Sequence, residues 1–235
     1  MRMQDMKDSA RIQEEELSFT SGGRRIGIQA WRSQRAYSPA VLVLRGAGGA
    51  DAGNRYISHM GRAVATQGFD TFLVEYFDRT GTTYATETLI KTNGPAWLET
   101  IHDAIDFLSS REDVDTEHIG MFGYSLGGYL AVAQAARDER VKAIVELAGG
   151  VDAETAAGVR RLPPMLIVHG REDQRVSFTN ALELQSLCEK LHTPVQTLFL
   201  PGERHLLSAG AGLVAVRQAL HFFDAHLRCS NAALC

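Results

Sequence analysis

The sequence is poor in cysteine and has no long apolar run, and each absence argues against a class of protein. Three cysteines occur among 235 residues, and an odd, sparse set does not form the disulfide framework of a small secreted protein. We therefore expect reduced thiols and a cytoplasmic location. No stretch approaches the roughly 18 apolar residues that a transmembrane helix needs. The polar first 16 residues also lack the apolar core of a secretory signal.

Positive charge is not in excess either. Lysine and arginine number 24 against 28 aspartates and glutamates, so that the formal net charge is −4. Proteins that bind nucleic acid usually present a basic surface, so we expect neither nucleic acid nor a membrane as a partner. No cluster of histidine, cysteine or aspartate has the spacing of a zinc site, and we expect no bound metal. The pattern favours no particular oligomeric state.

The length and composition suit one α/β domain that folds without disulfides. Single α/β domains often run to this length, and a content of 45% hydrophobic and 22% charged residues is ordinary for a globular protein. We expect residues 1–235 to form one domain, with residues 1–14 as a flexible or peripheral N-terminal segment.

Short apolar runs alternate with helical patterns, which is typical of a mostly parallel sheet with helices on both faces. We expect strands at 17–20, 25–31, 40–44, 71–75, 118–122, 141–147, 165–169 and 195–200. We expect helices at 55–67, 94–110, 126–137, 177–191 and 212–227. Two long connections, 77–93 and 148–163, follow strands and would lie at the edge of the sheet where α/β folds bind ligands. Neither is long enough for a separate cap domain.

The strongest motif is Gly123-Tyr124-Ser125-Leu126-Gly127-Gly128. It fits G-x-S-x-G between an expected strand and an expected helix, which is the setting of a nucleophile elbow. Glycines let the strand and the helix approach closely, while the tight turn lifts the serine hydroxyl out of the backbone. We therefore predict that Ser125 is a nucleophile, rather than an incidental serine in a glycine-rich turn.

A serine hydroxyl is a weak nucleophile at neutral pH and needs a base. His205 follows the expected strand 195–200 and precedes the last helix, which places it in a loop at a strand's carboxyl end. The other histidines fall in helices, at a helix end, at the opposite edge of the sheet or beneath the site: His59, His102, His118, His169, His192, His221 and His226. We predict that His205 is the base.

Asp173 directly follows the apolar strand 165–169. The order Ser125, Asp173, His205 along the chain is the order of the triad in α/β-hydrolases. Glu146, near the end of the preceding strand, is the competing candidate for the acid. We predict that Asp173 orients the base, because both chain order and loop placement support it.

An oxyanion hole needs two backbone donors. The N–H of Leu126, just after the nucleophile, is the first. We expect the second from Ala47, with Gly46 as the alternative, because the loop Arg45-Gly46-Ala47-Gly48-Gly49 follows the expected strand 40–44. As a phosphate-binding loop this segment is poor, since no Gly-Lys-Ser/Thr follows.

These residues together resemble the dienelactone hydrolase family of α/β-hydrolases, over most of the chain. Besides the elbow, the narrower signs are Glu75-Tyr76-Phe77-Asp78-Arg79, Gly170-Arg171-Glu172-Asp173 and Pro201-Gly202-Glu203-Arg204-His205. The resemblance implies an α/β-hydrolase fold without a large cap. It also implies hydrolysis of a small ester, lactone or thioester, with neither a metal nor an organic cofactor.

The sequence departs from the best-known family members in two ways. They use a cysteine nucleophile, whereas this chain has Ser125. They also grip a substrate carboxylate with two arginines. Arg79 matches the first arginine by its place in the motif, and Ala209 stands at the position of the second. The resemblance therefore predicts that Arg79 contacts substrate; an arginine paired with Asp78 or Glu75 is the structural alternative.

Other residues near the predicted site are further candidates for substrate contact. Tyr124 precedes the nucleophile, and Arg45 opens the oxyanion loop at a position where many relatives have histidine. Arg45 or Arg175 could supply the second positive charge. The loop lacks the acidic residue that controls the thiol in the dienelactone enzymes, which favours a serine esterase over true dienelactone hydrolase activity.

The three predicted catalytic residues do not determine which type of bond is cleaved. Thioesters and amides are cleaved with the same groups, and an acceptor other than water would make the protein an acyltransferase. A non-catalytic protein that binds a small molecule on this fold is a further alternative, because fold does not imply function.

Overall fold

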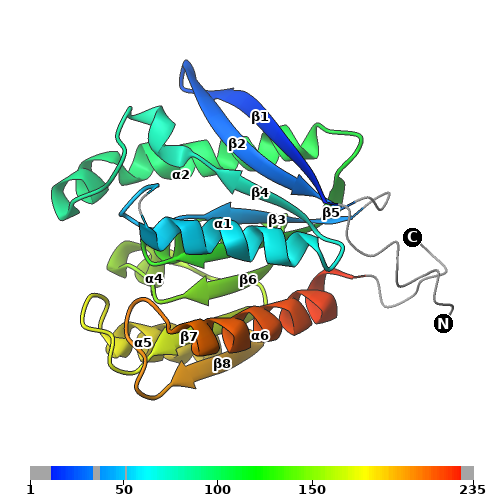
Figure 1. Ribbon diagram of the computed structural model, residues 1–235. Coiled ribbons are helices and arrows are strands. Elements are labelled where there is room, and N and C mark those ends of the chain that lie inside the picture. Colours follow the sequence, from blue (N-terminus) through cyan, green and yellow to red (C-terminus); the bar gives the residue numbers. More distant parts are fainter. Residues whose placement is uncertain (1–11, 34–37, 51, 229–235) are drawn as a thin grey trace, which may run out of the picture.

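The computed structural model describes residues 12–33, 38–50 and 52–228, and their strands form one eight-stranded sheet (Figure 1). The strands are β1 (Gln13–Ser21), β2 (Arg24–Arg32), β3 (Pro39–Leu44), β4 (Asp70–Val74), β5 (Asp115–Tyr124), β6 (Val141–Leu147), β7 (Met165–Gly170) and β8 (Val195–Leu200). Their spatial order is β1-β2-β4-β3-β5-β6-β7-β8. β2 pairs antiparallel with β1 and β4, and every pair from β4 to β8 is parallel. The predicted mostly parallel sheet is confirmed.

Helices cover both faces of this sheet (Figure 1). The helices are α1 (Ala52–Ala65), η1 (Tyr76–Arg79), α2 (Glu87–Ser109), α3 (Leu126–Ala135), α4 (Ala153–Gly158), α5 (Phe178–Lys190) and α6 (Ala209–Leu227). Buried side chains of α2, α3 and α5 belong to one apolar cluster, and those of α1 and α6 belong to another. The sheet therefore separates two cores.

The central strand β3 explains why a buried strand has no polar face. Leu42 and Leu44 pack in the cluster beneath α2 and α3, whereas Val41 and Val43 pack in the cluster beneath α1 and α6. Successive side chains of a strand point to opposite faces. Since both faces are covered, every position must be apolar, and the sequence shows a continuous apolar run rather than an alternation.

Several elements begin a few residues earlier than the sequence pattern predicts, and the differences are largest for β1 and α2. β1 begins at Gln13, so residues 13 and 14 belong to the sheet and not to a peripheral segment; residues 1–11 lie outside the described residues. α2 begins at Glu87 rather than at residue 94, because the Thr86 side chain accepts a hydrogen bond from the N–H of Leu89 and caps the helix. Such a cap satisfies one of the free donors of the first turn.

The second long connection, 148–163, contains the short helix α4, which the sequence analysis missed. Asp152 caps this helix by accepting hydrogen bonds from the N–H and the hydroxyl of Thr155, at 2.8 and 2.6 Å. No α4 side chain is buried. The helix therefore lacks the apolar periodicity by which a helix is recognised in a sequence.

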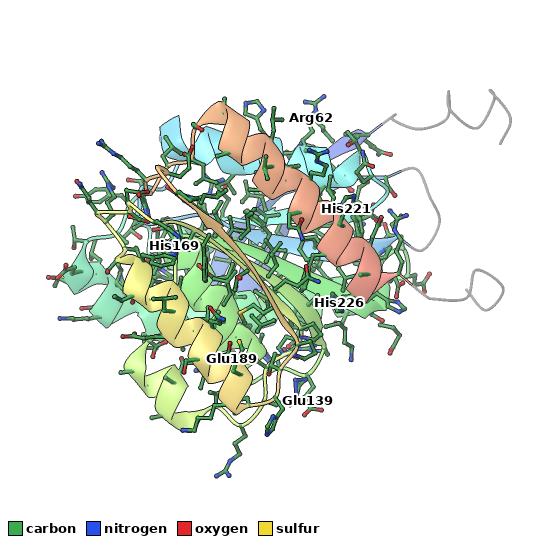
Figure 2. All side chains as sticks on the ribbon, turned by 90° about the horizontal axis from the view of Figure 1, so that it is seen from below. Arg62, Glu139, His169, Glu189, His221 and His226 are labelled. Atoms are coloured by element: carbon green, nitrogen blue, oxygen red, sulfur yellow. The ribbon has the colours of Figure 1, made fainter. Side chains whose placement is uncertain are left out.

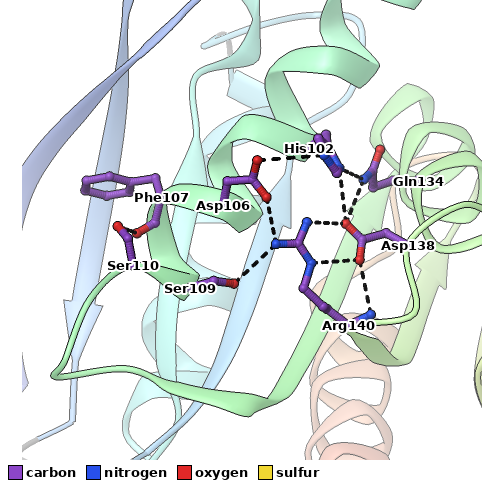
Figure 3. A network of polar contacts seen from close by, with 8 residues as sticks. All are labelled: His102, Asp106, Phe107, Ser109, Ser110, Gln134, Asp138 and Arg140. Atoms are coloured by element: carbon purple, nitrogen blue, oxygen red, sulfur yellow. Dashed lines mark hydrogen bonds and ion pairs between the residues drawn. The ribbon is translucent and has the colours of Figure 1, made fainter.

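A polar network fixes α2 against the amino end of β6 (Figure 3). The guanidinium of Arg140 donates to Asp138 at 2.7 and 2.9 Å and to Asp106 of α2 at 2.7 Å. His102 of α2 lies 3.2 Å from the same Asp138 carboxylate. Partly exposed ion pairs contribute little stability individually, but this network joins two elements that the chain places far apart.

Candidate active site

Ser125 occupies a strained turn between β5 and α3. Its φ of 54° and ψ of −119° lie in a region that residues other than glycine rarely adopt. A Cβ atom at Gly123 would lie 2.2 Å from the carbonyl oxygen of Gly127, and one at Gly127 would lie 2.3 Å from that of Leu44. The glycines of the motif are therefore needed for the close approach of strand and helix. The N–H of Ser125 donates to the Leu147 carbonyl at 2.8 Å, which holds the turn on β6.

The structure brings Ser125, His205 and Asp173 together at the carboxyl ends of β5, β8 and β7. Nε2 of His205 lies 3.0 Å from Oγ of Ser125. Nδ1 of the same imidazole lies 2.8 Å from Oδ2 of Asp173. Because the carboxylate of Asp173 accepts a hydrogen bond from the N–H at Nδ1, the neutral ring carries its proton there, and Nε2 is free to accept from the serine hydroxyl. This is the arrangement of a nucleophile, a base and an orienting acid.

The carboxylate of Asp173 is held from its other side by backbone donors. Its Oδ1 accepts hydrogen bonds from the N–H groups of Arg175 and Val176 at 2.8 and 3.0 Å. Nε2 of His169 donates to the Val176 carbonyl at 3.0 Å and lies 3.3 Å from Oδ2 of Asp173. Burial lowers the pKa of His169, so this imidazole is neutral and packs beneath the site, as predicted.

The remaining histidines lie away from this constellation. Figure 2 shows His221 and His226 on α6, apart from His169. His102 belongs to the network on α2, and Nδ1 of His118 lies 2.8 Å from Asp115 at the amino end of β5. Among the described residues, His205 is the histidine that contacts Ser125.

Glu146, the competing candidate for the acid, does not contact His205. Its side chain is fully buried at the end of β6, and one carboxyl oxygen accepts a hydrogen bond from the N–H of Gly149. Burial raises the pKa of Glu146 to about 8, and the nearby carboxylate of Asp173 adds to the rise. Burial thus favours the protonated form of this carboxyl at neutral pH.

A cavity of about 490 Å³ opens beside Ser125 and His205. It is lined by Gly46, Ala47, Gly48, Tyr124, Ser125, Gln174, Arg175, Arg204, His205 and Leu206. Binding pockets for small molecules commonly fall in this size range. The Tyr124 hydroxyl donates to the His205 carbonyl at 3.4 Å, and the two rings lie 5.3 Å apart. The structure therefore places Tyr124 at the cavity, as the sequence analysis expected.

The predicted oxyanion residues also border the cavity. Leu126 is the first residue of α3, so its N–H has no earlier carbonyl of the helix to bind. Gly46 and Ala47 line the cavity together with Ser125, and a Cβ at Gly46 would lie 3.2 Å from the Cβ of Ser125. The Ala47 carbonyl accepts from the N–H of Ala85 at 2.7 Å. This bond ties the oxyanion loop to the segment before α2.

The structure does not bring Arg79 or Arg45 to the cavity. The Arg79 guanidinium donates to the Gly22 carbonyl at 2.9 Å and to Glu99 at 3.0 Å, so it joins the β1–β2 turn to α2. Arg45 is buried and forms an ion pair with Glu75. These contacts do not support a substrate-binding role for either side chain. The predicted substrate contact of Arg79 is therefore not seen; the side chain has the alternative, structural role, with Gly22 and Glu99 as partners in place of Asp78 or Glu75.

Several cavity residues were missed by the sequence analysis. Arg175 lines the cavity, as one considered alternative held, but Gln174, Arg204 and Leu206 were not predicted there. The two long connections do not line it. Each missed residue lies directly beside Asp173 or His205 in the sequence, and this position was the one sign that could have indicated it.

The described residues hold neither a metal-binding cluster nor a membrane-spanning helix. In the described ranges, no group of three or more histidine, cysteine, aspartate or glutamate side chains is placed to hold a metal ion. None of the helices in the described part of the chain is both long and apolar enough to cross a membrane.

Comparison with known proteins gives a family and a fold. A model of the dienelactone hydrolase family matches residues 28–211. A Klebsiella pneumoniae structure described as a dienelactone hydrolase superposes with a TM-score of 0.79 at 17% identity, over 91% of this chain and 99% of that one. The dienelactone hydrolase of Anabaena variabilis gives a TM-score of 0.73 at 21% identity, over 93% and 100%. The predicted α/β-hydrolase fold is confirmed.

Two curated relatives match short segments. The hydrolase YtaP of Bacillus subtilis is 39% identical over 67 residues, or 27% of this chain. A polyketide transferase of Stachybotrys chlorohalonatus is 42% identical over 55 residues, or 23% of this chain. The matches span 22% and 18% of the relatives' own lengths.

Proposed function

Because the chain belongs to the dienelactone hydrolase family, we propose that it is a serine hydrolase that cleaves small carboxylic esters or lactones through an acyl-enzyme intermediate. The observation that carries this proposal is the hydrogen-bonded series Asp173, His205 and Ser125 beside the cavity. Both hydrogen bonds fall within the range expected of a nucleophile, its base and an orienting group.

The first half of the reaction forms the acyl-enzyme. Nε2 of His205 takes the hydroxyl proton of Ser125 as Oγ attacks the ester carbonyl. Asp173 keeps the second imidazole proton on Nδ1 and stabilises the positive charge that develops on the ring. The imidazolium then gives its proton to the departing alcohol, and the acyl group remains on Oγ.

The second half repeats these steps with water. His205 removes a proton from a water molecule, the resulting hydroxide attacks the acyl carbonyl, and the carboxylic acid leaves as the proton returns to Ser125. In both tetrahedral intermediates the former carbonyl oxygen of the substrate carries a negative charge. The N–H groups of Leu126 and Ala47 are the proposed donors to that oxygen, with Gly46 as the alternative to Ala47.

The cavity wall supports a preference for negatively charged substrates. Arg175 and Arg204 line the cavity, and neither guanidinium forms an ion pair with another residue of the described ranges. A guanidinium pairs with a carboxylate through two parallel hydrogen bonds. These two residues are the proposed substrate contacts in place of Arg79.

The proposed substrate bond is an ester and the proposed acyl acceptor is water; each has alternatives. Thioesters and amides use the same groups, so thioesterase and amidase activities are the first alternatives. Transfer of the acyl group to an alcohol or amine is the second. A non-catalytic binding protein is the third, but such a protein has no need of a hydroxyl, an imidazole and a carboxylate in hydrogen-bonded series.

A fluorophosphonate probe, which reacts with an activated serine, tests the proposal. We expect labelling of the wild-type protein on Ser125 and hydrolysis of short p-nitrophenyl esters. Ser125→Ala should lose both, whereas Ser186→Ala should keep both, because Ser186 is exposed on α5, away from the cavity lining. Ester hydrolysis that survives in Ser125→Ala would contradict the proposal. Matched thioester and amide substrates, with and without added alcohol, then separate the alternatives.

A further inference from the structure

A buried acidic side chain, which the proposed mechanism does not use, lies directly beneath the nucleophile. Glu146 stands at the end of β6, fully buried. A Cβ atom at Gly128, in the first turn of α3, would lie 2.9 Å from its Oε1. A Cβ at Gly149 would lie 2.6 Å from the same oxygen and 2.8 Å from the Ser125 carbonyl. The Glu146 carboxyl is thus enclosed between the first turn of α3 and the turn at 148–149.

The backbone beside Glu146 holds the backbone of Ser125. The Leu147 carbonyl accepts the Ser125 N–H at 2.8 Å, and the next residue, Ala148, has a φ of 54°. A positive φ is unfavourable for alanine and persists only where surrounding contacts impose it. Oε1 of Glu146 supplies such a contact by accepting the N–H of Gly149, which closes the turn around Ala148. Ser125 and Ala148, both at positive φ, are thus joined through Leu147, and the N–H of Ala148 donates to the Val168 carbonyl at 2.9 Å.

In the described part of the chain, no lysine, arginine or histidine forms an ion pair with Glu146. The ionisable groups that interact with it are Asp173 after β7, Tyr129 on α3 and Cys188 on α5. All of these are neutral or negative, and burial raises the pKa of Tyr129 to about 12 and that of Cys188 to about 11. Within the described residues Oε2 of Glu146 has no hydrogen-bond partner. A neutral carboxyl suits this site, and burial keeps the pKa of Glu146 near 8.

We propose that Glu146 is a positioning residue: its protonated carboxyl holds the turn at Ala148 and Gly149, and through the Leu147 carbonyl it keeps the strained backbone of Ser125 aimed at substrate. This inference rests on the proposed function, since it needs Ser125 to be the nucleophile. Glu146 itself touches neither substrate nor the reacting atoms.

Ionisation of Glu146 would place a second negative charge near Asp173 in a dry interior. Desolvation and repulsion both favour movement of the charged carboxylate out of its buried position. The hydrogen bond from the Gly149 N–H would then be lost. We therefore expect kcat to decline at alkaline pH as Glu146 ionises. If Glu146 only filled space, its replacement would leave the decline of kcat at alkaline pH unchanged.

Three variants test the proposal on the full chain. Glu146→Leu keeps the bulk but removes the acceptor, Glu146→Gln keeps the acceptor without the charge, and Glu139→Gln removes an exposed carboxylate close by in sequence. The measurements are kcat and KM for a p-nitrophenyl ester and the rate of fluorophosphonate labelling, from pH 6 to 10. Thermal unfolding is measured alongside.

For Glu146→Leu we expect kcat and the labelling rate to fall about tenfold, as for the loss of one buried hydrogen bond, with KM within about twofold. Glu146→Gln should restore both rates to within about threefold at pH 7 and lack the wild-type decline above about pH 8. Glu139→Gln should match wild type throughout.

Three results would overturn the proposal. The first is a wild-type kcat and labelling rate in Glu146→Leu. The second is an equal loss of both rates in Glu146→Gln and Glu146→Leu, and the third is a decline of kcat at alkaline pH that persists in Glu146→Gln. If Glu146→Leu does not fold, the pH profile of Glu146→Gln decides alone. A wild-type protein that the probe does not label would overturn the proposed function as well. Labelled wild type with unaltered Glu146 variants overturns the positioning role alone.

Discussion

Replacing Asp173 by asparagine tests the orientation of the imidazole with almost no change of shape. Oδ1 of Asp173 accepts the N–H groups of Arg175 and Val176, while Oδ2 faces Nδ1 of His205 at 2.8 Å. In the variant, the amide oxygen must stay on the side of the two backbone donors, because an NH₂ group there would face two other donors. The amide NH₂ is then directed at Nδ1 of His205.

This reversal changes which imidazole nitrogen carries the proton. Nδ1 must now accept, so the proton of the neutral ring moves to Nε2, which faces Ser125. A protonated Nε2 cannot take the serine proton. In a serine protease the corresponding change lowers kcat by about 10⁴, equivalent to roughly 5.5 kcal/mol of transition-state stabilisation. We expect a loss of this size in kcat, with KM within a few-fold of wild type.

Steady-state hydrolysis of a short p-nitrophenyl ester measures the effect. Glu172→Gln is the matched control, because Glu172 is the adjacent carboxylate and is exposed; it should keep wild-type kcat. A crystal structure of the Asp173→Asn variant would establish that the carboxamide keeps both backbone donors. Retention of more than about a tenth of wild-type kcat, or a greater loss in Glu146→Gln, would refute the assignment of the acid.

Four other outcomes follow from the structure. Ser125→Ala should lower kcat by about 10⁶ while the thermal unfolding midpoint stays close to wild type; a residual rate of a tenth would contradict this. Because burial raises the pKa of Glu146 from 4.5 to about 8, its contribution to stability is fully present below about pH 4.5 and is lost as the pH rises to 8, by about 1.4 kcal/mol per unit. Urea denaturation should show this slope in wild type and not in Glu146→Gln; parallel curves would disprove it. Arg175→Ala and Arg204→Ala should each lower kcat/KM about tenfold for an anionic ester relative to a neutral ester of equal size, whereas Arg79→Ala should affect both esters equally. Exhaustive chelation should leave esterase activity unchanged, and activity restored by a divalent ion would count against the metal-free mechanism.

The sheet could be predicted because burial on both faces leaves a clear pattern in the sequence. The strand at 141–147 was predicted with the bounds that the structure gives β6, and the strand at 195–200 with those of β8. The elbow was predictable for a different reason. The approach of α3 excludes a side chain at Gly123 of β5, and the approach of the end of β3 excludes one at Gly127. The need for a close backbone approach therefore determines these residue types.

The role of Arg79 could not be predicted, because arginine serves ion pairs and substrates alike. Its partners, Gly22 and Glu99, are 57 and 20 positions away along the chain, and no local pattern indicates such contacts. The cavity lining was missed for a similar reason. Arg204 and Gln174 lie beside catalytic candidates, but only the paths of their loops decide that they face the same space.

The spacing of the three central groups also bears on how the protein is made. His205 follows Ser125 by 80 positions and Asp173 by 32, so a chain synthesised from its N-terminus acquires the proposed nucleophile well before the proposed base. A chain interrupted before β8 contains the elbow and yet has no group to activate it. During refolding, β7 and β8 must also join the sheet by parallel pairing, which involves distant segments and is therefore slow. Recovery of esterase activity should consequently lag behind recovery of helical structure, and the lag measures the docking of the last two strands.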